Sequence, residues 1–280
     1  MEDLSVRSGD VELAASYSPA GETVIVALQG AGEGTRDFRS YTHLHDLLPP
    51  AGIGVVTFDR RGEGESTGDS SRGRFEVQVD DALAVLRAVD AADIGLWGIS
   101  QGGWIGPLAA AASDEVKFLV LVASTGVTPS EQMMYAVERQ LRLAGYGDDV
   151  VERALDLHRR FEDWIHTHAP EPDEQLAADL WAGLDEPTLL DEESRRLWIE
   201  EMDYDPRPAI AQVRVPTLLF YGDADSWTPV EPSVEAWRAA AGADVEIVVI
   251  PGAEHDLTMP DGSFAPEYEA KLVDWRVRSR

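Results

Sequence analysis

The chain has 280 residues, and its 52 acidic against 23 basic residues give a formal net charge of −29. Such a field repels nucleic-acid phosphates and anionic lipid headgroups, so we expect neither nucleic acid nor a membrane surface as a partner. The absence of cysteine excludes disulfides, thiolate metal sites and cysteine nucleophiles. Any chemistry must therefore come from oxygen and imidazole groups.

The beginning of the chain is acidic and alternates polar with apolar residues, whereas an export signal starts basic and continues apolar. The longest apolar runs, such as residues 118–123, are far shorter than the ~20 residues of a membrane span. The sequence therefore predicts a soluble, cytoplasmic protein acting on a small-molecule substrate. It leaves the oligomeric state open, a homo-oligomer included.

The first elements in chain order are strands. Residues 5–16 alternate around the turn signal Ser8-Gly9-Asp10, which predicts a hairpin. Compact apolar runs follow at 23–28, 53–58, 94–98 and 118–123, separated by helix-length segments such as 75–89. Strands that alternate with helices predict an α/β fold, with a mostly parallel sheet and helices on both faces.

The alternation stops between residues 127 and 212. This stretch predicts only helices, at 131–145, 148–168, 173–184 and 191–202. The sheet pattern then returns, with strands at 216–222 and 245–250 and helices at 230–241 and 265–277. We therefore expect a core formed by 1–126 and 213–280, and a helical lid insertion at 127–212 over the strand ends, where open α/β sheets hold their sites.

A candidate nucleophile stands directly after the third of the apolar runs. Gly98-Ile99-Ser100-Gln101-Gly102 matches the G-x-S-x-G nucleophile elbow in its strand, turn and helix context. The turn must hold Ser100 in a strained conformation that exposes its hydroxyl. Gly98 and Gly102 would avoid collisions of a Cβ atom with the neighbouring strand and helix.

A serine hydroxyl needs a base to take its proton, and a histidine base needs an acid to orient it. For this elbow both partners should follow the serine, each in a loop after a later strand. Asp223 and Asp225 follow one strand, and His255 follows the next. We expect Asp225 to be the acid, since the turn that begins at Gly222 leaves Asp223 near the strand. Asp256 is expected to be an ordinary loop residue.

The other histidines do not predict a metal site. His43 and His45 precede the serine in a predicted helix, and His158, His166 and His168 belong to the insertion. Histidines two apart on a helix point in different directions. A dinucleotide fingerprint from Gly30 also fails, because Thr35 stands where the third glycine is required. We expect neither a metal nor a cofactor.

Acyl transfer also needs donors for the developing oxyanion. The backbone N–H of Gln101, at the start of the elbow helix, is one candidate. The glycine-rich loop after residues 23–28 offers the second, for which we choose Ala31 and keep Gly32 as the alternative.

Four segments resemble one known family. "GISQGGW", "FDRRGEGES", "YGDADSWTP" and "PGAEH" are similar to the elbow, post-strand loop, acid loop and histidine loop of the α/β-hydrolase superfamily, in particular its lidded serine esterases. The resemblance covers roughly 11–125 and 213–277 and fades across the insertion. It implies the α/β-hydrolase fold with the following roles: nucleophile Ser100, base His255, acid Asp225, and oxyanion donors Ala31 and Gln101.

The chain departs from the family at one point. Gln29-Gly30 stands where the family commonly has His-Gly before the oxyanion residue, so different hydrogen bonds should support this loop. Arg60 and Arg61 follow a neighbouring strand. They either clamp a substrate carboxylate or pair with nearby carboxylates and fix the loop.

The resemblance implies a carboxylesterase on small or medium acyl esters, acting through an acyl-enzyme. Relatives with the same triad cleave amides, thioesters or peptide N-termini, and a non-catalytic small-molecule-binding protein is a third reading. A serine at the elbow argues against a dehalogenase, which needs a carboxylate there. Several apolar residues of the insertion either line an acyl pocket or form ordinary core: Met133, Met134, Tyr135, Trp164, Trp181 and Trp198.

Overall fold

A computed structural model describes residues 1–32, 34–70, 74–167, 172–180, 192–240 and 244–278. The chain forms two compact units. The core unit comprises Met1–Gly126 with Pro206–Arg280, and the helical unit comprises Val127–Asp205. Among the described residues, no helix combines the length and the apolar character needed to cross a bilayer.

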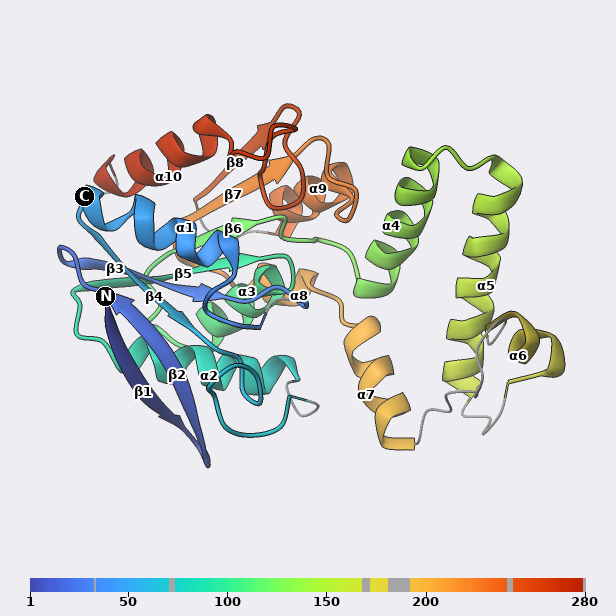
Figure 1. The fold of residues 1–280 in the computed structure, drawn as a ribbon, viewed down its shortest axis with the longest axis horizontal. Helices are drawn as coiled ribbons and strands as arrows, with labels where there is room; N and C mark the ends of the chain where they lie inside the picture. Colours follow the sequence, from blue (N-terminus) through green and yellow to red (C-terminus); the bar gives the residue numbers. More distant parts are fainter. Residues whose placement is uncertain (33, 71–73, 168–171, 181–191, 241–243, 279–280) are drawn as a thin grey trace. The chain divides into compact units, whose positions relative to one another are not determined.

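The core unit is built on one eight-stranded sheet with the order β1-β2-β4-β3-β5-β6-β7-β8 (Figure 1). Pairing is antiparallel between β1 and β2 and between β2 and β4, and parallel from β4 to β8. The strands are β1 Glu2–Ser8, β2 Val11–Ser18, β3 Thr23–Leu28, β4 Ile53–Phe58, β5 Asp93–Ile99, β6 Leu119–Val122, β7 Thr217–Gly222 and β8 Val245–Ile250. The mostly parallel α/β sheet predicted from the sequence is confirmed.

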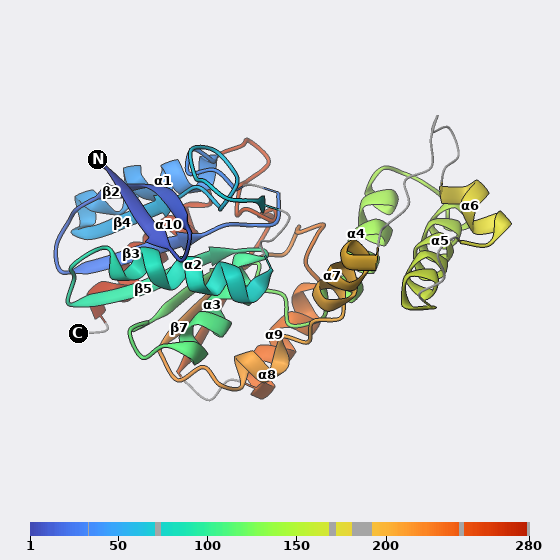
Figure 2. The same cartoon turned by 90° about the horizontal axis from the view of Figure 1, so that it is seen from below.

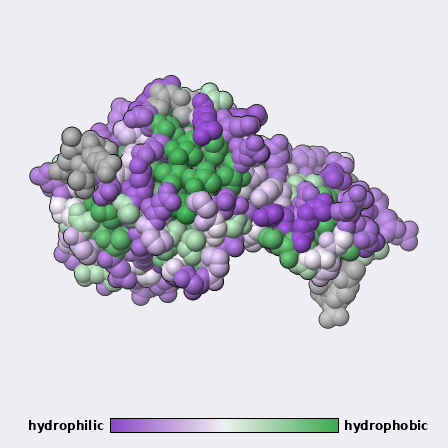
Figure 3. Space-filling model, turned by 90° about the horizontal axis from the view of Figure 1, so that it is seen from above, coloured by the Kyte–Doolittle hydropathy of each residue, from purple (hydrophilic) through white to green (hydrophobic). Residues whose placement is uncertain are grey.

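Four of the inner strands are buried along their whole length. Every residue of β3, β4, β6 and β7 is buried, as expected for parallel strands with helices on both faces. The outer strand β8 is less covered and leaves Val249 exposed. Figure 3 shows apolar surface gathered on the core unit's face seen from above, the side where β8 and α10 lie in Figure 1.

Helices cover both faces of this sheet (Figures 1 and 2). α1 and α10 share one face, where Tyr41 and Leu44 join Tyr268 and Leu272 in the apolar core. α2 and α3 pack together on the other face, and α8 contacts α3 and α9. The helical elements are α1 Arg39–Leu47, the 3-10 turn η1 Pro49–Ala51, α2 Phe75–Arg87, α3 Gly102–Ala112, α8 Arg207–Ile210, α9 Val230–Ala240 and α10 Pro266–Arg278.

The helical unit contains α4 Pro129–Leu143, α5 Asp148–Thr167, α6 Glu174–Leu180 and α7 Glu192–Met202. A capping box starts α4, because the Thr128 hydroxyl accepts from the Glu131 N–H while Glu131 accepts from the Thr128 N–H. Trp164 is buried in the unit's own core and Trp198 packs against that core, while Trp181 lies outside the described residues. The function of this unit as a lid stays a prediction.

One contact in the helical unit depends on protonation. His166 Nδ1 lies 2.8 Å from the Glu162 carbonyl oxygen, and its Nε2 lies 2.9 Å from Asp203 Oδ2. Both partners accept hydrogen bonds, so both ring nitrogens must carry protons, and only the imidazolium satisfies them. The hydrogen bond to Asp203 raises the pKa of His166, helped by the Glu162 carbonyl. The charged ring thereby joins α5 to the residue just beyond α7.

We expect this contact to stabilise α5 and α7 against local opening only at acidic pH, where His166 is charged. A pKa raised by folding gives a stabilisation that is full below the unfolded value of about 6.5 and is lost as pH rises through the folded value. The pair is largely exposed, so it contributes no more than ~1 kcal/mol. Hydrogen exchange of α5 and α7 peptides should be slower in wild type than in His166→Gln near pH ~5.5 and equal near pH ~9. A difference that persists at the higher pH would contradict the assignment.

Candidate active site

Ser100 occupies the sharp turn between β5 and α3. Its φ is 54°, a left-handed conformation that costs energy for any residue with a Cβ atom. Two backbone hydrogen bonds hold the turn, from the Ser100 N–H to the Val122 carbonyl and from the Gly103 N–H to the Ser100 carbonyl. The serine is therefore fixed in a conformation that an unconstrained chain would avoid.

The glycines of the turn are needed for space. A Cβ atom on Gly98 would stand 2.4 Å from the Gly102 carbonyl oxygen, and one on Gly102 would stand 2.8 Å from that of Leu28. Both contacts are with backbone, which cannot turn aside. Ser100 Oγ makes no hydrogen bond within the described part of the chain, so its hydroxyl is available to a ligand.

Asp225 follows β7 and is buried, with 1% of its surface exposed. Its Oδ1 accepts from the backbone N–H groups of Trp227 and Thr228 at 2.7 and 2.9 Å. Its Oδ2 lies 2.9 Å from His255 Nδ1. Asp223, the alternative acid, is exposed and accepts instead from the Gly252 N–H. The structure thus joins His255 to Asp225 and turns Asp223 toward the β8 turn.

His255 lies in the loop after β8, and its ring is oriented through Nδ1. Besides Asp225, the hydrogen-bond partner of that nitrogen among the described residues is Thr228 Oγ1, at 3.5 Å. With the carboxylate accepting at Nδ1, the neutral ring carries its proton there and keeps a lone pair on Nε2. Nε2 makes no hydrogen bond in the described part of the chain. Asp256 accepts from Thr258 within the loop, as expected of a loop residue.

The oxyanion-loop candidates lie beside the serine. A Cβ atom on Gly30 would lie 3.6 Å from Ser100 Cβ, so the loop that follows β3 approaches the elbow closely. Ala31 and Gly32 are exposed, and their N–H groups donate to no atom of the described chain. Gln101, the other candidate donor, immediately precedes α3. As donors to an oxyanion, Ala31 and Gln101 stay predictions.

Arg60 and Arg61 have different hydrogen-bond partners. Arg61 forms a bidentate pair with Asp81, with bonds of 2.8 and 2.6 Å. Arg60 pairs with Glu63 at 3.0 Å and also donates to the carbonyl oxygens of the loop after β3. The sequence left two interpretations open for these arginines, a clamp for a substrate carboxylate or pairing with nearby carboxylates that fixes the loop. These contacts match the second.

Trp227 is a site residue that the sequence reasoning missed. Its side chain is 43% exposed, and its ring centroid lies 6.5 Å from that of His255. A large apolar side chain left open beside the candidate base is a natural contact for a ligand. Its place two residues after the acid, within "GDADSWTP", was the available signal.

The two histidines that precede Ser100 in the chain take part in packing, while His168 lies outside the described residues. His43 stacks on Phe264 with centroids 3.9 Å apart, and His45 bonds Ser18 and Thr57 through its two nitrogens. Burial lowers the pKa of both rings, which favours their neutral forms. The described residues include no cluster of three or more side chains suited to hold a metal ion.

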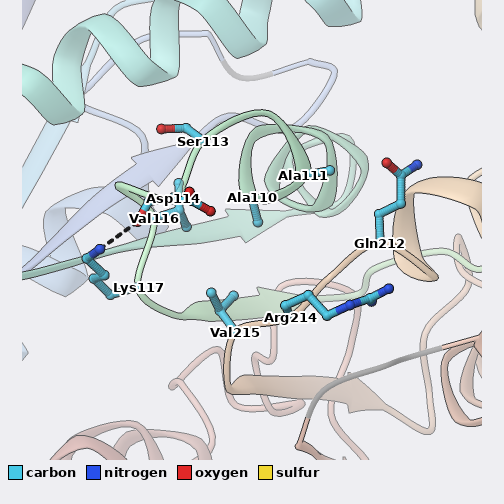
Figure 4. Close-up of a pocket in the computed structure, with 9 residues that line it drawn as sticks. All are labelled: Ala110, Ala111, Ser113, Asp114, Val116, Lys117, Gln212, Arg214 and Val215. Carbon is cyan, nitrogen blue, oxygen red and sulfur yellow. Dashed lines mark hydrogen bonds between the residues drawn. The ribbon is translucent and has the colours of Figure 1, made fainter.

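A separate pocket of about 480 Å³ lies at the amino-terminal ends of the strands, opposite the ends that carry the candidate site. Figure 4 shows it between the turn after α3, with Asp114 and Lys117, and the segment before β7, with Gln212 and Arg214. The Lys117 amine donates to the Asp114 carbonyl, and the Arg214 guanidinium points away from that amine. The residues of this pocket precede β6 and β7, whereas Ser100, Asp225 and His255 follow their strands. The pocket is therefore distinct from the candidate active site.

The chain is similar to several known proteins. An "uncharacterized 31.7 kDa protein in traX-finO intergenic region" of Escherichia coli is 26% identical over an alignment of 252 residues, with a coverage of 80% of this chain and 80% of the other. The proline iminopeptidase of Mycobacterium smegmatis is similar in structure, with a TM-score of 0.65, 18% identity and coverage of 98% of this chain and 97% of the other. The Pyrococcus furiosus esterase Pf2001 gives a TM-score of 0.67 and 16% identity, covering 99% and 90%.

The structural neighbours share the fold with this chain at low sequence identity. The sequence model of one family matches residues 25–267, a range that includes the elbow, the acid loop and the histidine loop. The chain belongs to the alpha/beta hydrolase family.

Proposed function

We propose that the protein is a serine hydrolase of carboxylic esters, with Ser100 as nucleophile, His255 as general base and Asp225 as the orienting acid. The observation that carries the proposal is the 2.9 Å contact of His255 Nδ1 with a carboxylate buried beneath it. That contact leaves Nε2 as the basic nitrogen. The strained serine turn and the glycine-rich loop beside it are the other parts that ester hydrolysis needs.

In the proposed reaction, Ser100 Oγ bonds to the ester carbonyl carbon while His255 Nε2 takes the hydroxyl proton. The negative charge moves to the carbonyl oxygen, where the N–H groups of Ala31 and Gln101 would stabilise it. The carbon–oxygen bond to the alcohol then breaks, and the alcohol leaves with the proton from His255. An acyl group remains on Ser100.

Water completes the reaction. His255 takes a proton from the water, whose oxygen bonds to the acyl carbon, and the bond to Ser100 Oγ breaks. The proton returns to Ser100 and the carboxylic acid leaves. Asp225 keeps its charge throughout, and its Oδ2 stabilises the imidazolium that forms twice in each cycle.

Trp227 supports an ester with an apolar substituent. Its exposed ring lies next to His255, where an acyl chain or an aromatic alcohol would contact it. A contact between two aromatic rings adds about 0.5–1.5 kcal/mol beyond area burial, which an aromatic alcohol would gain here. We therefore propose small or medium acyl esters as the substrate class, and include amides, thioesters and N-terminal peptides in the panel to be assayed.

The test is covalent labelling by a fluorophosphonate, followed by intact mass. An activated serine attacks the phosphorus and displaces fluoride, so we expect a single adduct on wild type and none on Ser100→Ala. Circular dichroism of both proteins controls for folding. A folded wild type that takes no adduct, or a Ser100→Ala variant labelled equally, would overturn the proposal in favour of a binding protein with the hydrolase fold.

A further inference from the structure

We infer that Arg60 is a positioning residue that aims the oxyanion donors of the loop after β3. The inference rests on the proposed function, because it concerns how the same site stabilises an oxyanion. It adds a residue from the loop after β4 to the residues assigned to the site so far.

The contacts of Arg60 are unusual for a cation in so acidic a chain. Its side chain is 10% exposed, and one carboxylate, Glu63, lies 3.0 Å from Nη1. The same Nη1 also donates to the Ala31 carbonyl at 3.2 Å, while Nη2 donates to the Gly30 carbonyl. The guanidinium thus holds two successive peptide units with one rigid group.

These bonds determine where the neighbouring N–H groups point. In a trans peptide unit the C=O and the N–H point in opposite directions. The Gly30 carbonyl and the Ala31 N–H belong to one unit, and the Ala31 carbonyl and the Gly32 N–H belong to the next. With both carbonyls on Arg60, the N–H groups of Ala31 and Gly32 are both directed away from the guanidinium. These are the two candidate donors in this loop.

Other contacts fix the start of the loop, but they do not orient the peptide units that carry the candidate donors. The Gln29 side-chain amide donates to the Phe58 carbonyl at 2.6 Å, and the Gly30 N–H donates to the hydroxyl of buried Tyr41 at 3.3 Å. Beyond Gly30, the described contacts of Ala31 are those of its carbonyl with Arg60. Arg60 is therefore the group that sets the orientation of the donor-bearing peptides.

The test separates positioning from general stability by comparing two inhibitors. A trifluoromethyl ketone with a butyl chain adds to Ser100 and forms a tetrahedral oxyanion, whereas the methyl ketone of the same chain stays planar. Lysine keeps the charge of Arg60 but cannot bond two carbonyls in the fork geometry. We expect Arg60→Lys to weaken the binding of the trifluoromethyl ketone about 10- to 100-fold. This loss is smaller than the roughly 10²–10³-fold effect of a deleted donor. The methyl ketone should bind as in wild type. The inhibitor ratio, which is the Kd of the methyl ketone divided by the Kd of the trifluoromethyl ketone, should therefore fall.

Kinetics and a matched control complete the experiment. On p-nitrophenyl butyrate, kcat of Arg60→Lys should fall by the same factor while KM stays within about twofold. Arg61→Lys is the matched control, because it makes the same change at a neighbouring arginine whose bonds go to Asp81 and not to the loop. Its inhibitor ratio should equal that of wild type.

An unchanged inhibitor ratio in Arg60→Lys would overturn the inference. An equal loss of affinity for both ketones leaves the ratio unchanged in this way and marks a merely structural residue. If Arg60→Lys does not fold, Glu63→Gln releases one anchor of the guanidinium and should lower the ratio in the same direction; an unchanged ratio there also overturns it. A wild type that takes no fluorophosphonate adduct overturns the proposed function as well, whereas a labelled wild type with an unaltered ratio in the variants overturns this inference alone.

Discussion

Replacing His255 with alanine is expected to lower kcat for p-nitrophenyl butyrate by about 10⁶-fold, the effect of losing the base of a serine triad. Without the imidazole, the Ser100 proton loses its proposed acceptor, and Ser100 Oγ makes no hydrogen bond in the described part of the chain that could supply another. KM should change little, because the role proposed for the ring is proton transfer and not substrate binding. Steady-state kinetics of the purified variant measure both constants.

The control is another histidine of the core unit. His45→Gln should retain kcat within a few-fold, since glutamine can still bond Ser18 and Thr57. Added imidazole should restore part of the activity of His255→Ala if a small base can enter the vacated space. A His255→Ala variant with nearly normal turnover would exclude His255 as the base and leave the Asp225 contact as a structural one.

The parts of the fold that the sequence predicted are those with strong local signals. The apolar runs at 23–28, 53–58 and 245–250 correspond residue for residue to β3, β4 and β8, because turn residues bound each run on both sides. The elbow was predictable for a related reason, since only glycine fits where a Cβ atom would meet backbone at 98 and 102. Such constraints are written in a few adjacent residues.

The contacts that complete the candidate site join residues distant in sequence, and periodicity does not encode them. The bonds from Arg60 to the loop at Gly30 span about thirty residues and required the register of β3 and β4. The openness of Trp227 also depends on what the rest of the fold leaves uncovered. Pattern reasoning could place Trp227 next to the acid but could not show its ring beside His255.

The choice between the two aspartates after β7 shows what could be predicted from the sequence and what could not. Chain order narrowed the acid to Asp223 or Asp225, and an argument about the turn favoured Asp225. The structure adds the physical difference: Asp225 is buried against His255, whereas Asp223 is exposed and holds the Gly252 N–H. Two neighbouring carboxylates therefore stand in unlike surroundings, which makes them a matched pair for mutation.

Asp225→Asn is expected to lower kcat by about 10⁴-fold with the fold retained. The amide keeps an acceptor oxygen for the Trp227 and Thr228 N–H groups, so its NH₂ group must face His255 Nδ1. Nδ1 then becomes the acceptor, the ring proton moves to Nε2, and the nitrogen that should take the Ser100 proton is already protonated. NMR of ¹⁵N-labelled imidazole nitrogens would report the change of tautomer directly.

Asp223→Asn is the control in the same turn. It replaces one charged acceptor of the Gly252 N–H with a neutral one, at an exposed position that does not contact His255. Its kcat should stay within about tenfold of wild type, because the loss is that of a single charge-assisted hydrogen bond. The reverse order, with Asp223→Asn the inactive variant, would show that the contact between His255 and Asp225 is not the one used in turnover. Equal and large losses in both variants would instead mean that the whole turn, and not one carboxylate, orients the histidine.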